Sequence, residues 1–150
     1  MQTVRLYEIP ACKMVSSGIG MFGEEKFDHF DAWFSTQSRG IFPKDFLYFD
    51  KNGEKEGFHW LYLVESGMKV PEEFDVIDFP GGLYAVSTDV DGTEDSTERK
   101  VAVNAFLAAN GLERDVSRAE LGHVITSPAA KAVLGFEQMD HWLPVRPKNA

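Results

Sequence analysis

An acidic and an aromatic residue share one face of a predicted strand near the C-terminus. Asp140 precedes Trp142 by two positions in the segment 140–145 (DHWLPV), and successive side chains of a strand alternate between its two faces. A carboxylate beside an indole ring can hold a cation through its charge and through the ring quadrupole. It could also act as a general base if burial raised its pKa. The alternative is structural: Asp140 faces water or pairs with a lysine across the sheet.

Further residues could complete a site with this acid. Three amphipathic rings fall on predicted strands and can line a cavity while keeping a polar edge available: Trp60, Tyr62 and Tyr84. Glu120 lies on the strand predicted over 119–126 and is the second candidate acid. The pattern indicates small-molecule binding, with hydrolysis as an alternative in which Asp140 or Glu120 activates water as the catalytic base.

We expect neither a metal nor a cofactor. The four histidines lie far apart, and the single cysteine, Cys12, falls in a predicted strand, where a buried and inert thiol is the expected state. Gly18-Ile19-Gly20 followed by Gly23 superficially resembles a dinucleotide-binding fingerprint. It lacks the parallel strand–helix–strand context that such a loop requires, so we do not assign it a nucleotide.

The net charge and the number of cysteines indicate which partners and which cellular setting to expect. The 150 residues carry a formal net charge of −9 at pH 7, whereas direct nucleic-acid binding needs a cationic face that displaces counterions. We therefore expect no direct contact with nucleic acid, although the acidic surface could meet a basic protein partner. A single cysteine suits a reducing, cytoplasmic setting. The sequence shows no signal peptide and no membrane span of about 18 apolar residues.

The order of predicted elements indicates two related units. Residues 9–12 (IPAC) and 79–82 (FPGG) both read apolar–Pro–small–small before a strand, and each strand is followed by a segment of helical periodicity. The helical stripes contain Phe27, Phe30 and Phe34 in the first unit and Ala102, Val103, Phe106 and Leu107 in the second. A short helix is expected over 128–134, with proline in its first turn. This order predicts an α+β fold of duplicated β-α-β-β units, with an antiparallel sheet and two helices on one face. We expect a single domain, 1–150, made of pseudo-repeats at about 1–70 and 71–150.

Four segments resemble the GyrI-like (effector-binding) family in their order and separation. They are 27–33 (FDHFDAW), 42–50 (FPKDFLYFD), 81–86 (GGLYAV) and 140–145 (DHWLPV). The family contains stand-alone gyrase-inhibitor-type proteins and the ligand domains of AraC- and MerR-type multidrug regulators. Its architecture is the duplicated β-α-β-β arrangement that the residue pattern predicts separately.

The resemblance implies a ligand cleft between the two halves, lined by aromatic residues and a carboxylate. In the regulators this pocket receives bulky, lipophilic and often cationic molecules. The family pattern falls on Tyr84, Asp140 and Trp142, and it adds His123 to the candidate ligand-binding residues. The chain departs from the family at 120–123 (ELGH), where relatives often carry Glu-x-Tyr, and at 58–60 (FHW), where they often carry an aspartate.

The resemblance favours a protein that senses or sequesters a xenobiotic-like small molecule. Two alternatives come with it. Some members hydrolyse cyclopropane-bearing compounds, which implies a hydrolase that uses Asp140 or Glu120. Others are gyrase-inhibitor-type interaction modules, which implies a protein partner such as gyrase or a regulator.

Overall fold

The computed structural model describes residues 3–37, 40–50 and 56–149. The chain divides into two compact units, of which unit 1 comprises residues 1–10 and 81–150 and unit 2 comprises residues 11–80. The chain passes from one unit to the other directly after Pro10 and directly after Pro80. The pseudo-repeats expected from the sequence, at about 1–70 and 71–150, therefore do not coincide with the compact units.

An exchange of strands explains this division. The strands concerned are β1 (Arg5–Ile9), β2 (Cys12–Gly20), β5 (Asp75–Phe79) and β6 (Gly82–Val90). β1 leads into β2 but pairs with β6, and β5 leads into β6 but pairs with β2. The registers correspond, because Ile9 lies opposite Gly82 and Phe79 lies opposite Cys12. Each strand before a proline thus pairs with the strand that follows the other proline.

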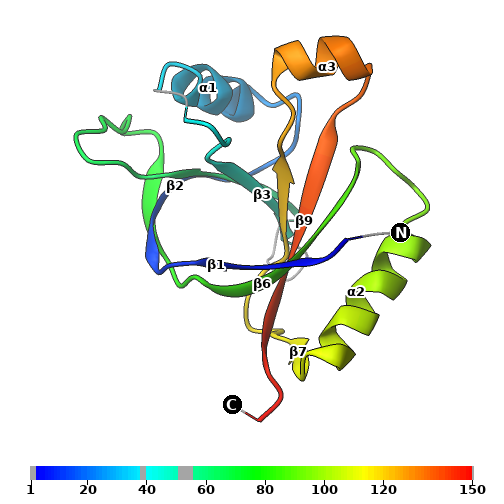
Figure 1. Ribbon diagram of the computed structural model, residues 1–150. Coiled ribbons are helices and arrows are strands. Elements are labelled where there is room, and N and C mark those ends of the chain that lie inside the picture. The colour runs from blue at the N-terminus through cyan, green and yellow to red at the C-terminus, as the bar shows by residue number, and fades with distance from the viewer. Residues whose placement is uncertain (1–2, 38–39, 51–55, 150) are drawn as a thin grey trace. The chain divides into compact units, whose positions relative to one another are not determined.

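Unit 2 is an antiparallel sheet covered by one helix. Its further elements are α1 (Glu25–Phe34), β3 (Asp45–Asp50) and β4 (Gly57–Leu63), and the strand order is β3-β4-β2-β5. The predicted stripe of α1 is confirmed, since Phe27 and Phe30 are buried. Phe30 makes an edge contact with Phe74, with ring centroids 5.0 Å apart, and packs against Val15 on the sheet. Figure 1 shows α1 beside β2, and α1 also contacts β4.

Unit 1 has the same plan with additional elements. They are α2 (Thr97–Ala109), β7 (Leu112–Arg114), β8 (Leu121–Val124), α3 (Pro128–Leu134) and β9 (Gln138–Pro147). The strand order is β1-β6-β9-β8, all antiparallel, and β7 pairs with β9. Val103 and Leu107 of α2 are buried against Ala85 and Val145 of the sheet. The α+β class and the antiparallel pairing expected from the sequence are confirmed.

The glycine pair before β6 is needed because an arginine approaches it closely. Gly81 and Gly82 have φ angles of 69° and 124°, which residues with a Cβ rarely adopt. A Cβ on Gly82 would collide with the Arg118 guanidinium. Arg118 donates to the carbonyl oxygens of Gly81 at 3.0 Å, Leu83 at 2.9 Å and Val145 at 2.8 Å. The arginine therefore ties the start of β6 to the end of β9.

No helix in the described ranges 3–37, 40–50 and 56–149 is long and apolar enough to cross a membrane.

Candidate functional site

The two faces of the sheet in unit 1 carry different chemistry. Along β9, Asp140 and Trp142 alternate with His141 and Leu143, so the two pairs point to opposite faces. Leu143 packs against the core beneath α2, so His141 and Leu143 belong to the face that α2 covers. We call the other the Asp140 face. Residues opposite each other in an antiparallel pair share a face, which places Arg5, Tyr7, Tyr84, Thr88 and His123 on it.

A charged cluster connects three strands on the Asp140 face. The Arg5 guanidinium Nη2 donates to Asp140 Oδ1 at 3.0 Å and to Thr88 Oγ1 at 3.2 Å. The Thr88 hydroxyl donates to the same Asp140 oxygen at 2.5 Å. The strand exchange brings Arg5 here, because β1 pairs with β6 and β6 pairs with β9. Two donors thus converge on one carboxylate oxygen.

The cluster balances the charge of a buried acid. The Asp140 side chain is 6% exposed, whereas that of Arg5 is 36% exposed. Burial opposes the charge of Arg5, but the negative charge of Asp140 and the hydrogen bond to Tyr7 outweigh it and raise the pKa of the guanidinium. Removal of one partner from a buried ion pair leaves an uncompensated charge, which is strongly destabilising. Arg5 is therefore the internal counter-ion of Asp140.

Aromatic rings surround Trp142 next to this ion pair. The Trp142 ring centroid lies 5.6 Å from that of Tyr7, 5.7 Å from that of Tyr84 and 6.0 Å from that of His123. Arg5 also lies over the Tyr7 ring, 5.3 Å from its centroid. Trp142, Tyr84 and His123 are buried, while Tyr7 is 42% exposed. The arrangement offers apolar ring surfaces beside one positive and one negative group.

The structure brings four of the predicted ligand-binding residues together: Tyr84, His123, Asp140 and Trp142. Glu120, the second candidate base, lies elsewhere in unit 1. Its carboxylate Oε1 is 2.7 Å from Arg114 Nη2, and both side chains are 56% exposed. An acid this exposed lacks the apolar surroundings that general-base catalysis by a carboxylate usually needs.

Trp60 and Tyr62 belong to unit 2, where they form part of the core beneath α1. Trp60 Nε1 donates to Asp45 Oδ2 at 3.0 Å, and its ring contacts Phe34 with centroids 5.1 Å apart. Tyr62 stacks on Phe34 at 5.3 Å. These contacts give both residues a packing role within their own unit.

Sequence analysis did not find Arg5, Tyr7 or Thr88. Arg5 and Tyr7 have the spacing of two that places side chains on one strand face, and this was the available signal. It did not identify the partner strand, because consecutive strands usually neighbour each other, whereas β1 joins β6.

The described residues contain no metal-binding group and no activated thiol. In the part of the chain that the structure describes, no three residues among His, Cys, Asp and Glu are grouped to hold a metal ion. Cys12 is a free cysteine of intermediate exposure, and burial raises the pKa of its thiol. A raised pKa lowers the thiolate fraction on which nucleophilic attack depends.

Solved structures share this architecture at low sequence identity. The C-terminal domain of EcmrR matches with 12% identity and a TM-score of 0.60, over 98% of this chain and 99% of the domain. A hydrolase from Listeria innocua matches with 11% identity and a TM-score of 0.67, over 96% of this chain and 92% of its own. SAV2435, in a structure with bound tetraphenylphosphonium, matches with 10% identity and a TM-score of 0.54, over 96% and 94%. The chain has the GyrI-like fold.

The likeness is one of fold alone. No protein-family model matches this chain, and no curated protein matches it in sequence. In the EcmrR–DNA complex, EcmrR matches 97% of this chain with 11% identity and a TM-score of 0.65. This chain spans only 58% of that EcmrR chain.

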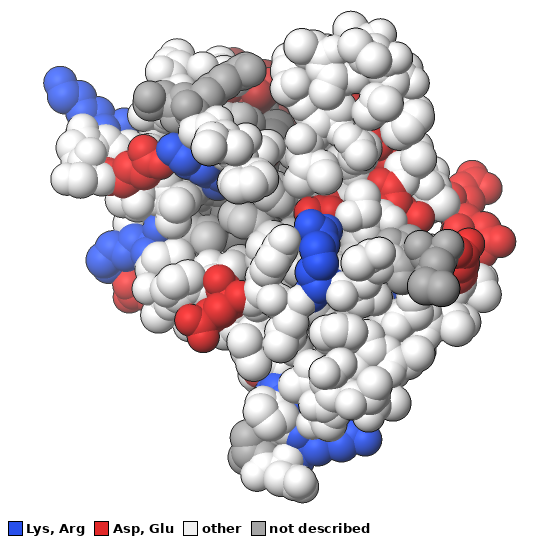
Figure 2. Space-filling view, in the orientation of Figure 1, with Lys and Arg blue, Asp and Glu red and all other residues white. Residues whose placement is uncertain are grey.

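The surface of the GyrI-like chain carries mixed charges. On the face shown in Figure 2, basic side chains are scattered among acidic and uncharged ones, and the described residues form no broad basic patch there. A nucleic-acid site needs clustered Lys and Arg along one face. The absence of direct nucleic-acid binding, expected from the net charge of −9, stays a prediction.

Proposed function

We propose that this GyrI-like chain binds a lipophilic small molecule on the Asp140 face of unit 1. The observation that carries the proposal is a buried carboxylate, Asp140, placed beside the ring of Trp142 and its aromatic neighbours. Ligand sites are mostly apolar with a small number of polar groups that fix orientation. Binding of this kind would serve to sense or to sequester the ligand.

The ion pair sets the charge preference of the proposed site. Asp140 favours a cationic ligand, because charge and ring quadrupoles act in the same direction. Arg5 opposes a cation, since its guanidinium already occupies Asp140 Oδ1 at 3.0 Å. A lipophilic cation must therefore share the carboxylate with Arg5 or displace it. We expect the affinity for cations to be limited by Arg5 and to rise when Arg5 loses its charge.

One protein with the same fold supports a ligand of this class, and a second suggests how the bound state could be read. SAV2435 has been solved with tetraphenylphosphonium, a bulky lipophilic cation. EcmrR, whose C-terminal domain shares the fold, has been solved on DNA. We infer by analogy that the bound state of this chain is read by a protein partner, such as a transcription regulator.

Two ions of the same shape and opposite charge test the proposal. Titration calorimetry with tetraphenylphosphonium and tetraphenylborate should show tighter binding of the phosphonium, because Asp140 attracts only the cation. Asp140→Asn should weaken phosphonium binding about tenfold, the equivalent of about 1.4 kcal/mol. Arg5→Gln should strengthen it.

Glu120→Gln is the matched control, since it also removes one carboxylate charge from unit 1. Glu120 is half-exposed and paired with Arg114, so phosphonium affinity should stay unchanged. Equal losses in Asp140→Asn and Glu120→Gln, or equal wild-type affinity for the two ions, would reject a site based on Asp140.

A hydrolase is the second candidate, because a Listeria innocua protein of this fold is described as a hydrolase. Asp140 is the candidate base, since it is the buried acid of the two. Its Oδ1 accepts bonds from Arg5 and Thr88, which leaves Oδ2 to activate a water. Loss of general-base catalysis costs about 10²- to 10⁴-fold, so Asp140→Asn should lower any turnover of a cyclopropane-bearing compound by that factor. Absence of turnover in the wild type would eliminate the hydrolase.

A further inference from the structure

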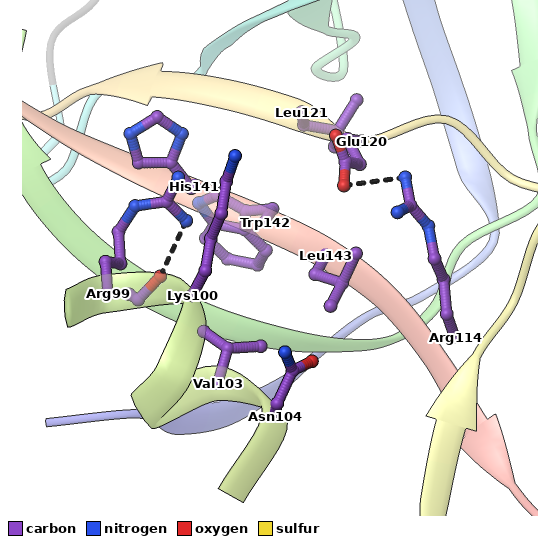
Figure 3. A pocket seen from close by; sticks show the side chains of 11 residues that line it. Arg99, Lys100, Val103, Asn104, Arg114, Glu120, Leu121, His141, Trp142 and Leu143 are labelled. Atoms are coloured by element: carbon purple, nitrogen blue, oxygen red, sulfur yellow. Dashed lines mark hydrogen bonds and ion pairs between the residues drawn. The ribbon is translucent and has the colours of Figure 1, made fainter. Parts of the chain in front are cut away.

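A groove lies on the α2 face of unit 1, with a volume of about 340 Å³. Its lining comes from the start of α2, from β6, β7 and β9, and from the beginning of β8 (Figure 3). The lining residues that matter for its chemistry are Arg99, Lys100, Asn104, Arg114, Glu120 and Leu143. The volume is within the range of small-molecule sites, at its lower end.

The charge of this groove is opposite to that of the protein. Three lining residues are cationic, and one, Glu120, is anionic, whereas the whole chain carries −9. Arg114 is paired with Glu120 at 2.7 Å. Arg99 donates to Asp89 at 2.7 Å and to Ser87 at 3.3 Å. Two of the three cations are thus held in place by partners.

Lys100 is the cation that is available to a ligand. Within residues 3–37, 40–50 and 56–149 its ammonium group makes no hydrogen bond or ion pair. Figure 3 shows Lys100 reaching from α2 past His141, while Arg114 stands on the other side of Leu143. A lysine ammonium can donate three hydrogen bonds and accepts none. The ammonium of Lys100 can therefore donate to an anionic ligand.

The groove also has an apolar side. Leu143 and Val103 line it together with Leu121 and Trp142, and Val103 is only 6% exposed. Asn104, from the next position of α2, adds an amide that can donate and accept. A ligand that fits must therefore combine a compact apolar body with an anionic group.

A histidine also lines the groove, and its pKa is lowered mainly by burial. His141 lines the groove, and burial followed by the charge of Arg99 lowers the pKa of its imidazole. Asp89, Glu120 and Asp140 act in the opposite direction and do not outweigh these two causes.

We propose that this groove binds a small organic anion, in which a carboxylate or phosphate group on a compact apolar body pairs with Lys100 and the body packs on Leu143 and Val103. The site is independent of the proposed function. Its charged residues belong to the α2 face, and only Trp142 borders both this groove and the aromatic group of the Asp140 face.

Benzoate and phenyl phosphate are suitable probes of the intact chain, with benzamide and benzylammonium as neutral and cationic counterparts. Calorimetric titration should show saturable binding of at least one anion with a stoichiometry of one, weakened by added salt. Lys100→Gln should weaken it by at least about threefold, as expected for an exposed charge pair. Asn104→Trp should abolish it by filling the groove from an exposed helix position.

Two control variants test whether the anion binds in this groove or elsewhere on the chain. Lys148→Gln removes the same charge at an exposed position that does not line the groove, so anion affinity should be unchanged. Arg5→Gln should also leave it unchanged, while altering tetraphenylphosphonium binding on the Asp140 face. Thermal unfolding verifies that each variant is folded. Absence of saturable anion binding, equal binding of benzamide, or equal losses in Lys100→Gln and Lys148→Gln would overturn the proposal.

Discussion

Arg5 and Asp140 are separated by 135 positions in the sequence, yet the guanidinium Nη2 lies 3.0 Å from the carboxylate Oδ1. Both residues belong to unit 1, because β1 pairs with β6 and not with β2, the strand that follows it in the chain. This pair neutralises the buried carboxylate of the Asp140 face. It therefore links the exchange of strands to the charge preference of the proposed ligand site.

The first prediction concerns the stability that this pair contributes. Breaking a buried pair costs about 3–5 kcal/mol, and the 36% exposure of the Arg5 side chain reduces the effect. We expect Arg5→Gln to lower the free energy of unfolding by about 1–3 kcal/mol. In urea titrations, the double variant Arg5→Gln/Asp140→Asn should lose less than the sum of the single variants.

The surface pair Lys13–Asp78 provides the comparison. Its charged atoms are 2.7 Å apart, but the side chains are 63% and 89% exposed. The coupling energy in the cycle Lys13→Gln and Asp78→Asn should be much smaller than that of the Arg5–Asp140 cycle, because solvent screens the exposed charges. If the two cycles gave equal coupling energies, burial would not be what makes the Arg5 pair important.

The second prediction concerns the glycine at the start of β6. Gly82→Ala combines a positive φ with a collision against the Arg118 guanidinium, so we expect a loss of more than about 2 kcal/mol in the free energy of unfolding. Gly92 has a φ of 84° but no atom within 4 Å of a Cβ built on it. Gly92→Ala should cost only about 1 kcal/mol, the cost of the backbone conformation. If Gly82→Ala and Gly92→Ala lowered the free energy of unfolding by similar amounts in chemical denaturation, the role given to Arg118 would be wrong.

The third prediction is a pH dependence that originates at His141. Burial and the charge of Arg99 lower the pKa of His141 in the folded chain, against the opposing charges of Asp89, Glu120 and Asp140. The unfolded chain therefore binds more protons below about pH 6.5, the ordinary pKa of histidine. The contribution of His141 to the free energy of unfolding is fully present above about pH 6.5. It is lost as the pH falls through the pKa of His141 in the folded chain. The slope cannot exceed about 1.4 kcal/mol per pH unit for one proton.

Urea titrations between pH 5 and pH 8 measure this slope. His141→Gln should make the stability of the chain depend less on pH in this window. An unchanged slope in His141→Gln would show that its imidazole titrates alike in the folded and unfolded chain.

The fourth prediction concerns nucleic acid. A chain of net charge −9 has too few clustered cations to release counterions from a duplex. We expect no retardation of a DNA duplex in a gel-shift assay at physiological salt. Salt-sensitive retardation that does not depend on DNA sequence would contradict this expectation.

The sequence by itself determined much of the local structure. Alternation of apolar residues indicated the strands, the spacing of Phe27 and Phe30 indicated α1, and proline with a flanking glycine placed the short helix α3 at Pro128–Leu134. Asp140 and Trp142 were predicted on one strand face, because that relationship depends only on the period of two within a single strand.

Only the tertiary structure decided which strands became neighbours. Side-chain periodicity is the same whether β1 pairs with β2 or with β6, so the sequence pattern could not bring Arg5 to Asp140. The same limit applies to Arg118, whose approach to Gly82 depends on long-range pairing. It applies also to the groove of Lys100, which α2 and four strands build jointly. Local residue types determine the elements, whereas packing of the apolar faces and the strand register determine which charges meet.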